Sequence, residues 1–110
     1  ICKYLLNEGA NLLIHDPKVE KNQVEFELRN VGIDNNSNWT FTKKLAGIFN
    51  NADAILVLTE WGMYKEINWK SVNKVLRNPS WLFDTRRIID PDIVNDCEFN
   101  FWQVGRGNDL

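Results

Sequence analysis

The chain has 110 residues, with 13 Lys and Arg against 15 Asp and Glu. A chain of this length can bury one hydrophobic core, so we expect a single domain over residues 1–110. There is no basic excess of the kind that nucleic-acid-binding proteins show, and no apolar run approaches the roughly 20 residues of a membrane span. We therefore expect a soluble, cytoplasmic protein that binds neither nucleic acid nor membrane.

The N-terminal part of the chain predicts a helix and two strand-like segments. Residues 1–8 read as part of an amphipathic helix that begins before Ile1, and Gly9 suits the C′ position after its end. Residues 11–14 (Asn-Leu-Leu-Ile) predict a short strand, which Pro17 ends. Residues 24–28 (Val-Glu-Phe-Glu-Leu) alternate with period two, which predicts an edge strand with one wet face.

The middle of the chain predicts a loop, a helix and a buried strand. Residues 32–38 are polar and read as a surface loop. Residues 42–49 predict a helix that has Thr42 as its N-cap and one apolar face, formed by Leu45, Ile48 and Phe49. The apolar run at residues 54–58 predicts a strand that is buried on both sides.

The last third of the chain predicts short helices between two more strands. Residues 60–76 predict one or two helices; the second has Asn68 as its N-cap and a buried stripe of Trp69, Val72, Val75 and Leu76. Residues 81–83 and 100–104 predict strands, and Pro91 suits the first position of a helix over about residues 91–96. Strands that alternate with helices favour an α/β fold with a doubly wound, mostly parallel, Rossmann-like sheet and helices on both faces.

Polar residues follow two of the predicted buried strands. Thr59 and Glu60 follow residues 54–58, and Arg86 lies just beyond residues 81–83. Carboxyl ends of parallel strands meet at one edge of the sheet, where α/β folds bind ligands. Because an Arg guanidinium presents a planar fork that bonds two acceptors at once, we predict that Arg86 holds an anion. The alternative is a surface arginine that pairs with Asp84 or Asp90 and stabilises the fold little.

No pattern in the chain predicts catalysis or a metal site. Cys2 and Cys97 form no CxxC or His-paired motif, so we expect thiols that are not catalytic, with a disulfide between them as the alternative. His15 is the only histidine and is expected to be structural. No Gly-x-Gly-x-x-Gly precedes Asp16, so an Asx turn before Pro17 is favoured over ribose binding.

Three further features favour a structural role. Arg87 is expected to be a solvated or structural charge. Glu60 and Trp61 are expected to begin a helix, where Glu favours the positive end of the helix dipole and Trp packs in the core or a subunit contact. The five tryptophans are expected to pack in the core and at interfaces, because there is no basic groove to make them a stacking platform for single-stranded nucleic acid.

Four motifs occur together in a fixed order. They are Asp-Pro at residues 16–17, Ala-Ile-Leu-Val-Leu-Thr-Glu-Trp at residues 54–61, Phe-Asp-Thr-Arg at residues 83–86 and Val-Gly-Arg at residues 104–106. In their order and separation these motifs resemble the C-terminal, UDP-binding domain of UDP-glucose 6-dehydrogenases. The chain departs from that pattern at His15, where the family usually has Tyr, and at Thr85, where it usually has Gly.

The resemblance implies a domain that is incomplete at its N-terminus. The family's domain begins with a central strand and loop that would precede Ile1. In the 3-2-1-4-5-6 strand order, that strand would lie between the strands at residues 11–14 and 54–58. We therefore expect the position to be filled by a strand of residues outside this 110-residue sequence or of another chain, or the two flanking strands to pair directly.

The resemblance also implies a function for the full-length protein. It would be an NAD-dependent UDP-glucose 6-dehydrogenase that oxidises UDP-glucose to UDP-glucuronate. Arg86 would bind UDP, NAD would be bound by an N-terminal domain outside this chain, and a central domain would supply the nucleophilic cysteine. We expect those domains and further copies of the protein as partners, and no activity from the 110 residues alone. Two alternatives stay open: a GDP-mannose or UDP-N-acetyl sugar dehydrogenase, and a non-catalytic α/β binding module.

Overall fold

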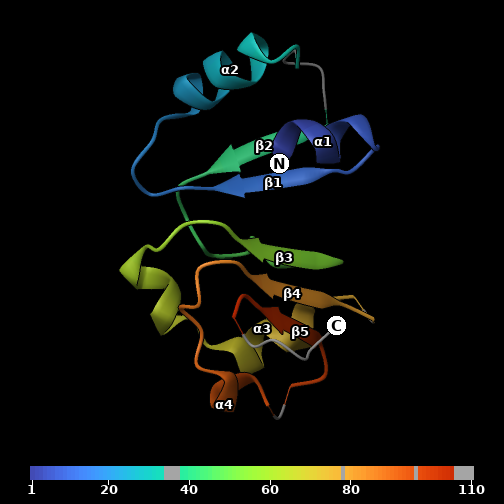
Figure 1. The fold of residues 1–110 in the computed structure, drawn as a ribbon, viewed down its shortest axis with the longest axis vertical. Coiled ribbons are helices and arrows are strands. Elements are labelled where there is room, and N and C mark those ends of the chain that lie inside the picture. The colour runs from blue at the N-terminus through green and yellow to red at the C-terminus, as the bar shows by residue number, and fades with distance from the viewer. Residues whose placement is uncertain (34–37, 78, 96, 106–110) are drawn as a thin grey trace. The chain divides into compact units, whose positions relative to one another are not determined.

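The computed structural model describes residues 1–33, 38–77, 79–95 and 97–105. The chain divides into two compact units, Ile1–Ile48 and Phe49–Leu110. Each unit contains a parallel sheet, with two strands in the first and three in the second (Figure 1). The α/β class and the parallel pairing are therefore confirmed, whereas the single domain stays a prediction. No helix among the described residues is both long and apolar enough to cross a membrane.

The first unit consists of helix α1 (Cys2–Asn7), strand β1 (Leu12–His15), helix α2 (Lys21–Asn30) and strand β2 (Trp39–Thr42). β1 and β2 pair in parallel from Leu12 opposite Trp39 to His15 opposite Thr42. The predicted end of α1 is confirmed. Gly9 has a φ of +89°, and the amide of Ala10 donates to the carbonyl of Leu5 at 3.0 Å, which closes the last turn.

The edge strand expected at residues 24–28 is wrong, because this segment lies inside α2. Val24 and Leu28 are four residues apart and share one helical face, on which Leu28 is buried. Phe26 points away from that face and is 62% exposed. Gly32 follows the end of the helix with a φ of +91°, and the amide of Ile33 donates to the carbonyl of Leu28 at 2.8 Å. Of the loop expected at residues 32–38, residues 34–37 lie outside the described residues.

The helix expected at residues 42–49 is also wrong. β2 ends at Thr42, and turns follow it. The hydroxyl oxygen of Thr42 accepts a hydrogen bond from the amide of Lys44 at 3.1 Å, so it closes a short turn instead of capping a helix. The β-branched and aromatic run Trp-Thr-Phe-Thr favours a strand once β1 offers it a partner.

The second unit has strands β3 (Ala54–Val57), β4 (Trp81–Asp84) and β5 (Asn100–Gln103), in the order β3-β4-β5. All three strands match their predicted positions to within one residue. β1 and β3 belong to different sheets. The orders β2-β1 and β3-β4-β5 match strands 3-2 and 4-5-6 of the predicted doubly wound order. The strand that would lie between them stays a prediction.

Three short helices connect these strands: a 3-10 helix, η1 (Gly62–Glu66), and the α-helices α3 (Trp69–Val75) and α4 (Pro91–Val94). Two predicted helix starts are confirmed. The side chain of Asn68 accepts from the amide of Ser71 at 3.2 Å, and Pro91 lies in the first turn of α4.

The core of the second unit lies around β4. Leu82 is fully buried, and Trp69 is 2% exposed and packs edge-on against Phe99. The remaining buried apolar side chains are Val57, Tyr64, Val72, Leu76, Ile89 and Val94. Val75 was expected on the buried stripe of α3 but is 40% exposed. At about 100° per residue, Val75 is turned about 120° away from Trp69 around the helix axis.

Candidate functional site

A broad, open hollow lies at the carboxyl edge of β3 and β4. Its lining is formed by Thr59, Glu60, Trp61 and Arg86. The first three residues follow β3, and Arg86 follows β4, so two neighbouring strands deliver the four side chains to the same place. The structure therefore brings Arg86 to the position that the sequence predicts, at the edge where α/β sheets bind ligands.

Among the described residues, one hydrogen bond of the side chain holds the guanidinium of Arg86 in place. Its Nε donates to the carbonyl oxygen of Leu58 at 2.9 Å, while the side chain is exposed. The two ion pairs found among the described residues, Lys43 with Glu20 and Arg77 with Asp53, do not include Arg86. Within those residues the expected alternative, a surface pair with Asp84 or Asp90, is therefore not formed. The outer N–H groups of the Arg86 fork remain available for an acceptor.

The carboxylate of Asp84 organises the loop that carries Arg86. Asp84 is fully buried, and its oxygens accept hydrogen bonds from the backbone amides of Arg86, Ile88 and Ile89 and from the side-chain amide of Gln103. Sequence reasoning treated Asp84 only as a surface partner for Arg86 and did not single out Gln103. The signal in the sequence was a polar residue at the carboxyl end of β4 and of β5, in each case directly after two or more apolar residues.

Thr85 fastens the same loop to the neighbouring strand. Its hydroxyl and its amide both donate to the carbonyl of Val57, the last residue of β3. Arg87 follows with a φ of +58°, and an added Cβ at Gly105 would lie 2.6 Å from Arg87 Nη1, so the guanidinium of Arg87 lies directly over that glycine. The loop after β4 thus contacts the ends of both neighbouring strands.

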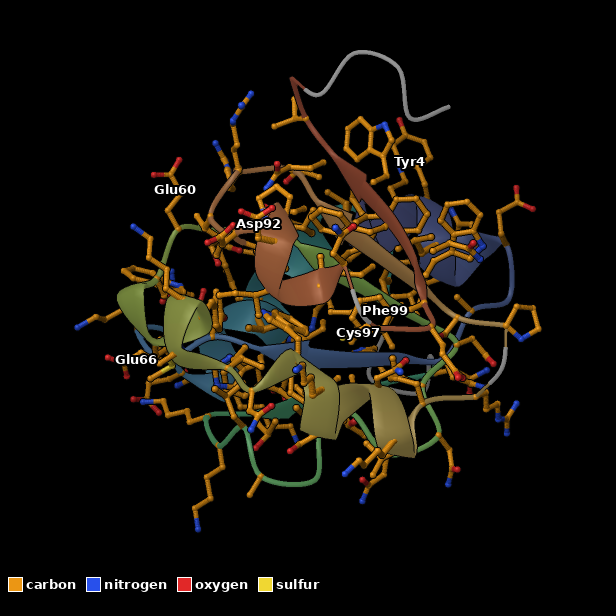
Figure 2. The ribbon with its side chains drawn as sticks, turned by 90° about the horizontal axis from the view of Figure 1, so that it is seen from below. Tyr4, Glu60, Glu66, Asp92, Cys97 and Phe99 are labelled. Atoms are coloured by element: carbon orange, nitrogen blue, oxygen red, sulfur yellow. The ribbon has the colours of Figure 1, made fainter. Side chains whose placement is uncertain are left out.

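Glu60 and Trp61 do not start a regular α-helix. η1 begins at Gly62, with Trp61 at its N-cap position and Glu60 one residue earlier. Glu60 is exposed and projects away from the ribbon, as Figure 2 shows. The hollow therefore contains one carboxylate and one guanidinium, which form no ion pair with each other.

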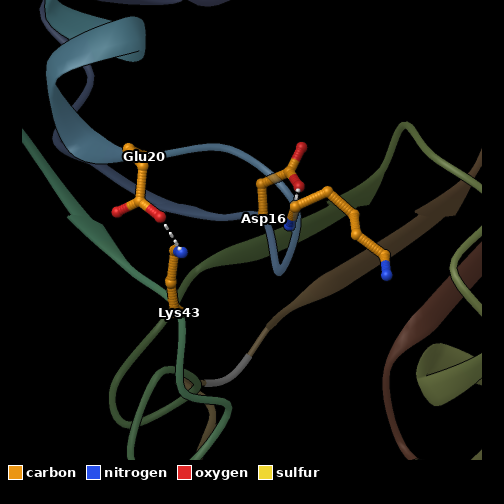
Figure 3. Close-up of polar contacts among 4 residues, drawn as sticks. Asp16, Glu20 and Lys43 are labelled. Carbon is orange, nitrogen blue, oxygen red and sulfur yellow. Dashed lines mark hydrogen bonds and ion pairs between the residues drawn. The ribbon is translucent and has the colours of Figure 1, made fainter.

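The carboxyl ends of β1 and β2 in the first unit carry a different set of polar residues (Figure 3). The carboxylate of Asp16 accepts from the amide of Lys18 at 2.8 Å, which confirms the predicted Asx turn. Glu20 and Lys43 form an ion pair. His15 Nε2 lies 3.2 Å from the carbonyl oxygen of Lys43, which suits the structural role expected for it. These contacts close the loops after β1 and β2.

The two cysteines are thiols and lie in different units. Cys2 is in α1 and Cys97 follows α4, and both are partly buried. Among the residues that the structure describes, no group of three His, Cys, Asp or Glu side chains could hold a metal ion. The exposed guanidinium of Arg86 is the one cationic group in the lining of the hollow.

Comparison with known proteins gives one consistent result. A sequence model of the UDP-glucose/GDP-mannose dehydrogenase family, UDP binding domain, matches residues 1–91. The UDP-glucose 6-dehydrogenase of Gallus gallus is 33% identical over an alignment of 108 positions, which covers 94% of this chain and 22% of that protein. The Bos taurus protein of the same name is 35% identical over 82% of this chain, and the Caenorhabditis elegans protein is 31% identical over 99% of it. The chain spans 19% to 23% of the length of these three relatives.

Proposed function

We infer that this chain holds the nucleotide end of a UDP-sugar at the carboxyl edge of the β3-β4-β5 sheet. The chain belongs to the UDP-glucose/GDP-mannose dehydrogenase family and matches the UDP-binding domain of that family. The observation that carries this proposal is the position of Arg86. Its fork lies on the open hollow, is anchored through Nε alone and has no ion-pair partner among the described residues.

Arg86 suits a phosphate for two physical reasons. A guanidinium can donate two parallel hydrogen bonds to one phosphate group, and such charge-assisted bonds are stronger than neutral ones. The bond from Nε to the carbonyl of Leu58 also restricts the side chain before any ligand arrives. Less conformational freedom is then lost on binding, so more of the interaction free energy appears as affinity.

For the full-length protein we propose the NAD-dependent oxidation of UDP-glucose to UDP-glucuronate; the relatives are named UDP-glucose 6-dehydrogenase. The described residues do not fit an NAD site: the sequence has no Gly-x-Gly-x-x-Gly, and the carboxylate of Asp16 is engaged by the amide of Lys18. NAD and the nucleophilic cysteine are assigned to other domains of the protein. Nucleotide binding here would anchor the substrate by its remote end and so orient the reacting carbon elsewhere.

The remaining proposals follow from family membership. The partners of this domain would be the NAD-binding and central domains of the same protein and further copies of it in a homo-oligomer, and we place the protein in the cytoplasm. The family also includes GDP-mannose dehydrogenases, so the nucleotide base of the substrate could be uracil or guanine. The relatives compared here are all named for UDP-glucose, which favours uracil over guanine.

The experiment is a calorimetric titration of the full-length protein with UDP, before and after the change Arg86→Ala. Loss of one charge-assisted contact should cost about 1.5 to 3 kcal/mol, or about 10- to 150-fold in Kd, while NAD binding stays nearly unchanged. Arg86→Lys should recover only part of the loss, because an ammonium is a point charge without the fork. Uridine has no phosphate, so its affinity should be nearly the same for Arg86→Ala as for the unaltered protein.

Arg77→Ala is the matched control. Arg77 is an exposed arginine of the same unit that pairs loosely with Asp53 at 3.7 Å and precedes β4, at the opposite edge of the sheet. Its removal should leave UDP binding unchanged. An unchanged Kd for UDP in Arg86→Ala would reject the proposed role of Arg86. Tighter binding of GDP than of UDP by the unaltered protein would favour the GDP-mannose alternative.

A further inference from the structure

We propose that Asp84 and Gln103 are positioning residues, a buried polar pair that holds the loop after β4 in the shape in which Arg86 can receive a phosphate. This inference rests on the proposed function and adds to it two residues that do not touch the ligand. Asp84 is fully buried and Gln103 is 2% exposed. They are directly opposite each other at the ends of β4 and β5.

The hydrogen bonds of Asp84 define the course of the loop. Oδ1 accepts from the amide of Arg86 at 3.1 Å, and Oδ2 accepts from the amides of Ile88 and Ile89 at 2.9 and 2.8 Å. Three amides within four consecutive residues therefore converge on one side chain. A buried carboxylate is tolerated only when hydrogen bonds replace its lost hydration, so this arrangement strongly favours one loop shape over others.

Gln103 joins the two ends of the loop. Its Nε2 donates to Asp84 Oδ2 at 2.9 Å and to the carbonyl oxygen of Ile89 at 2.7 Å. Both hydrogens of the amide are therefore used, one at the start and one at the end of the loop. Without Gln103, the Ile89 carbonyl would lose this donor and Asp84 would lose one of its four hydrogen bonds. Both atoms lie in a region that water does not reach easily, so the loop would have to open to solvate them.

Arg86 lies within this closed loop, and its own amide is the first of the three that Asp84 binds. The position of its backbone is what allows Nε to reach the carbonyl of Leu58 and the outer N–H groups to face the hollow. If the loop loosens, the guanidinium samples more orientations, and UDP must order it on binding. The effect should appear in nucleotide affinity although neither Asp84 nor Gln103 is a ligand.

The test uses the full-length protein with UDP as the probe. Gln103→Met keeps the length of the side chain and removes both donors. We expect about a 3- to 10-fold rise in the Kd for UDP, the cost of ordering one long side chain, with NAD binding unchanged. In the Arg86→Ala background the same substitution should produce no further loss, because it acts only through Arg86. Asp84→Asn, which replaces an acceptor oxygen by a donor, should act in the same direction.

A variant with a purely structural defect is the matched control. Val94→Ala shortens a buried apolar side chain of α4, which takes no part in the hydrogen bonds of the loop. It should lower the melting temperature without changing the Kd for UDP. A wild-type Kd in Gln103→Met, beside a weakened Arg86→Ala, would overturn the inference and leave the proposed function standing. Additive losses in the double variant would also overturn it. A wild-type Kd in Arg86→Ala itself would instead remove the proposed function.

Hydrogen exchange of the unaltered protein gives an answer even if the variants fold poorly. With the pair intact, the amides of Arg86, Ile88 and Ile89 should already be protected without nucleotide, and UDP should add little protection. Protection that appears only when UDP is added would mean that the ligand, and not Asp84 and Gln103, shapes the loop. That result would overturn the inference.

Discussion

The hydroxyl group and the backbone amide of Thr85 donate to one and the same atom, the carbonyl oxygen of Val57, at 2.7 and 3.1 Å. The amide bond continues the ladder between β3 and β4, and any residue could make it. The hydroxyl bond is specific to this side chain. It gives the loop an anchor that a residue without a hydroxyl group, such as glycine, would lack.

Thr85→Val should therefore destabilise the second unit. The change keeps the shape of the side chain and removes the hydroxyl in a partly buried site, which should lower the free energy of unfolding by about 0.5 to 1.5 kcal/mol. Chemical denaturation followed by tryptophan fluorescence would measure it. Thr85→Ser keeps the donor and serves as the control. Equal stability of the Val and Thr proteins would show that the hydroxyl bond contributes nothing net.

Gly105 should not tolerate a side chain. Its φ is +83°, and an added Cβ would lie 2.6 Å from Nη1 of Arg87. Gly105→Ala should cost about 1 to 2 kcal/mol from the backbone conformation alone, and it should push the Arg87 guanidinium aside. Gly62→Ala is the control, because no atom lies within 4 Å of the added Cβ and its φ is not positive. Arg87→Ala combined with Gly105→Ala should recover the steric part of the loss and not the backbone part.

Leu82 should be the most costly apolar position in β4. It is fully buried, so Leu82→Ala should lower the free energy of unfolding by about 2 to 5 kcal/mol. Leu56→Ala in β3 is the matched control. Leu56 is 37% exposed, so the same substitution should cost well under half as much. Denaturant unfolding of the two variants would measure the two losses of unfolding free energy. Similar losses for Leu82→Ala and Leu56→Ala would mean that β4 does not lie at the centre of the core.

The strand expected beside β3 leads to a prediction for the full-length protein. Among the described residues, β3 has a ladder with β4 only. A buried amide that lacks an acceptor costs about 1 to 3 kcal/mol, so the amides of β3 that face away from β4 should bond to a strand from outside this numbering. Hydrogen exchange should find them protected in the full-length protein. Exchange at the rate of an open peptide would contradict the predicted sheet order.

Several elements follow from the sequence because their signals are local. Gly9 ends α1, Asn68 caps α3 and Pro91 starts α4, each through the backbone preference or side-chain acceptor of one residue. The mostly apolar runs that form β3 and β4 predict strands of a parallel sheet. β4 does lie in the middle of its sheet, whereas β3, expected to be buried on both sides, lies at an edge, with Ala54 and Leu56 exposed. The order of the two strands in the chain then places Arg86 at the carboxyl edge.

Two segments could not be assigned in this way, because their local pattern fits two structures. Apolar residues at 24, 26 and 28 satisfy period two, yet Val24 and Leu28 alone are enough for a helical face. Residues 39–42 favour a strand only because β1 is there to pair with them. Segments of four or five residues carry too little pattern to decide. Residues 24–28 lie inside the longer helix α2, and residues 39–42 are a strand paired with β1.

For the candidate site, the order of elements along the sequence is enough to place Arg86 just beyond the carboxyl end of β4. The tertiary structure decided what Arg86 does not contact. Asp84, two residues away, was the natural partner for its charge, but Asp84 is buried and bonds to backbone amides and to Gln103, which is 19 residues further along the chain. That contact depends on the register of β5 against β4, which places Gln103 opposite Asp84. Register is set by the packing of the whole sheet, so the residues around Arg86 in the sequence do not predict it.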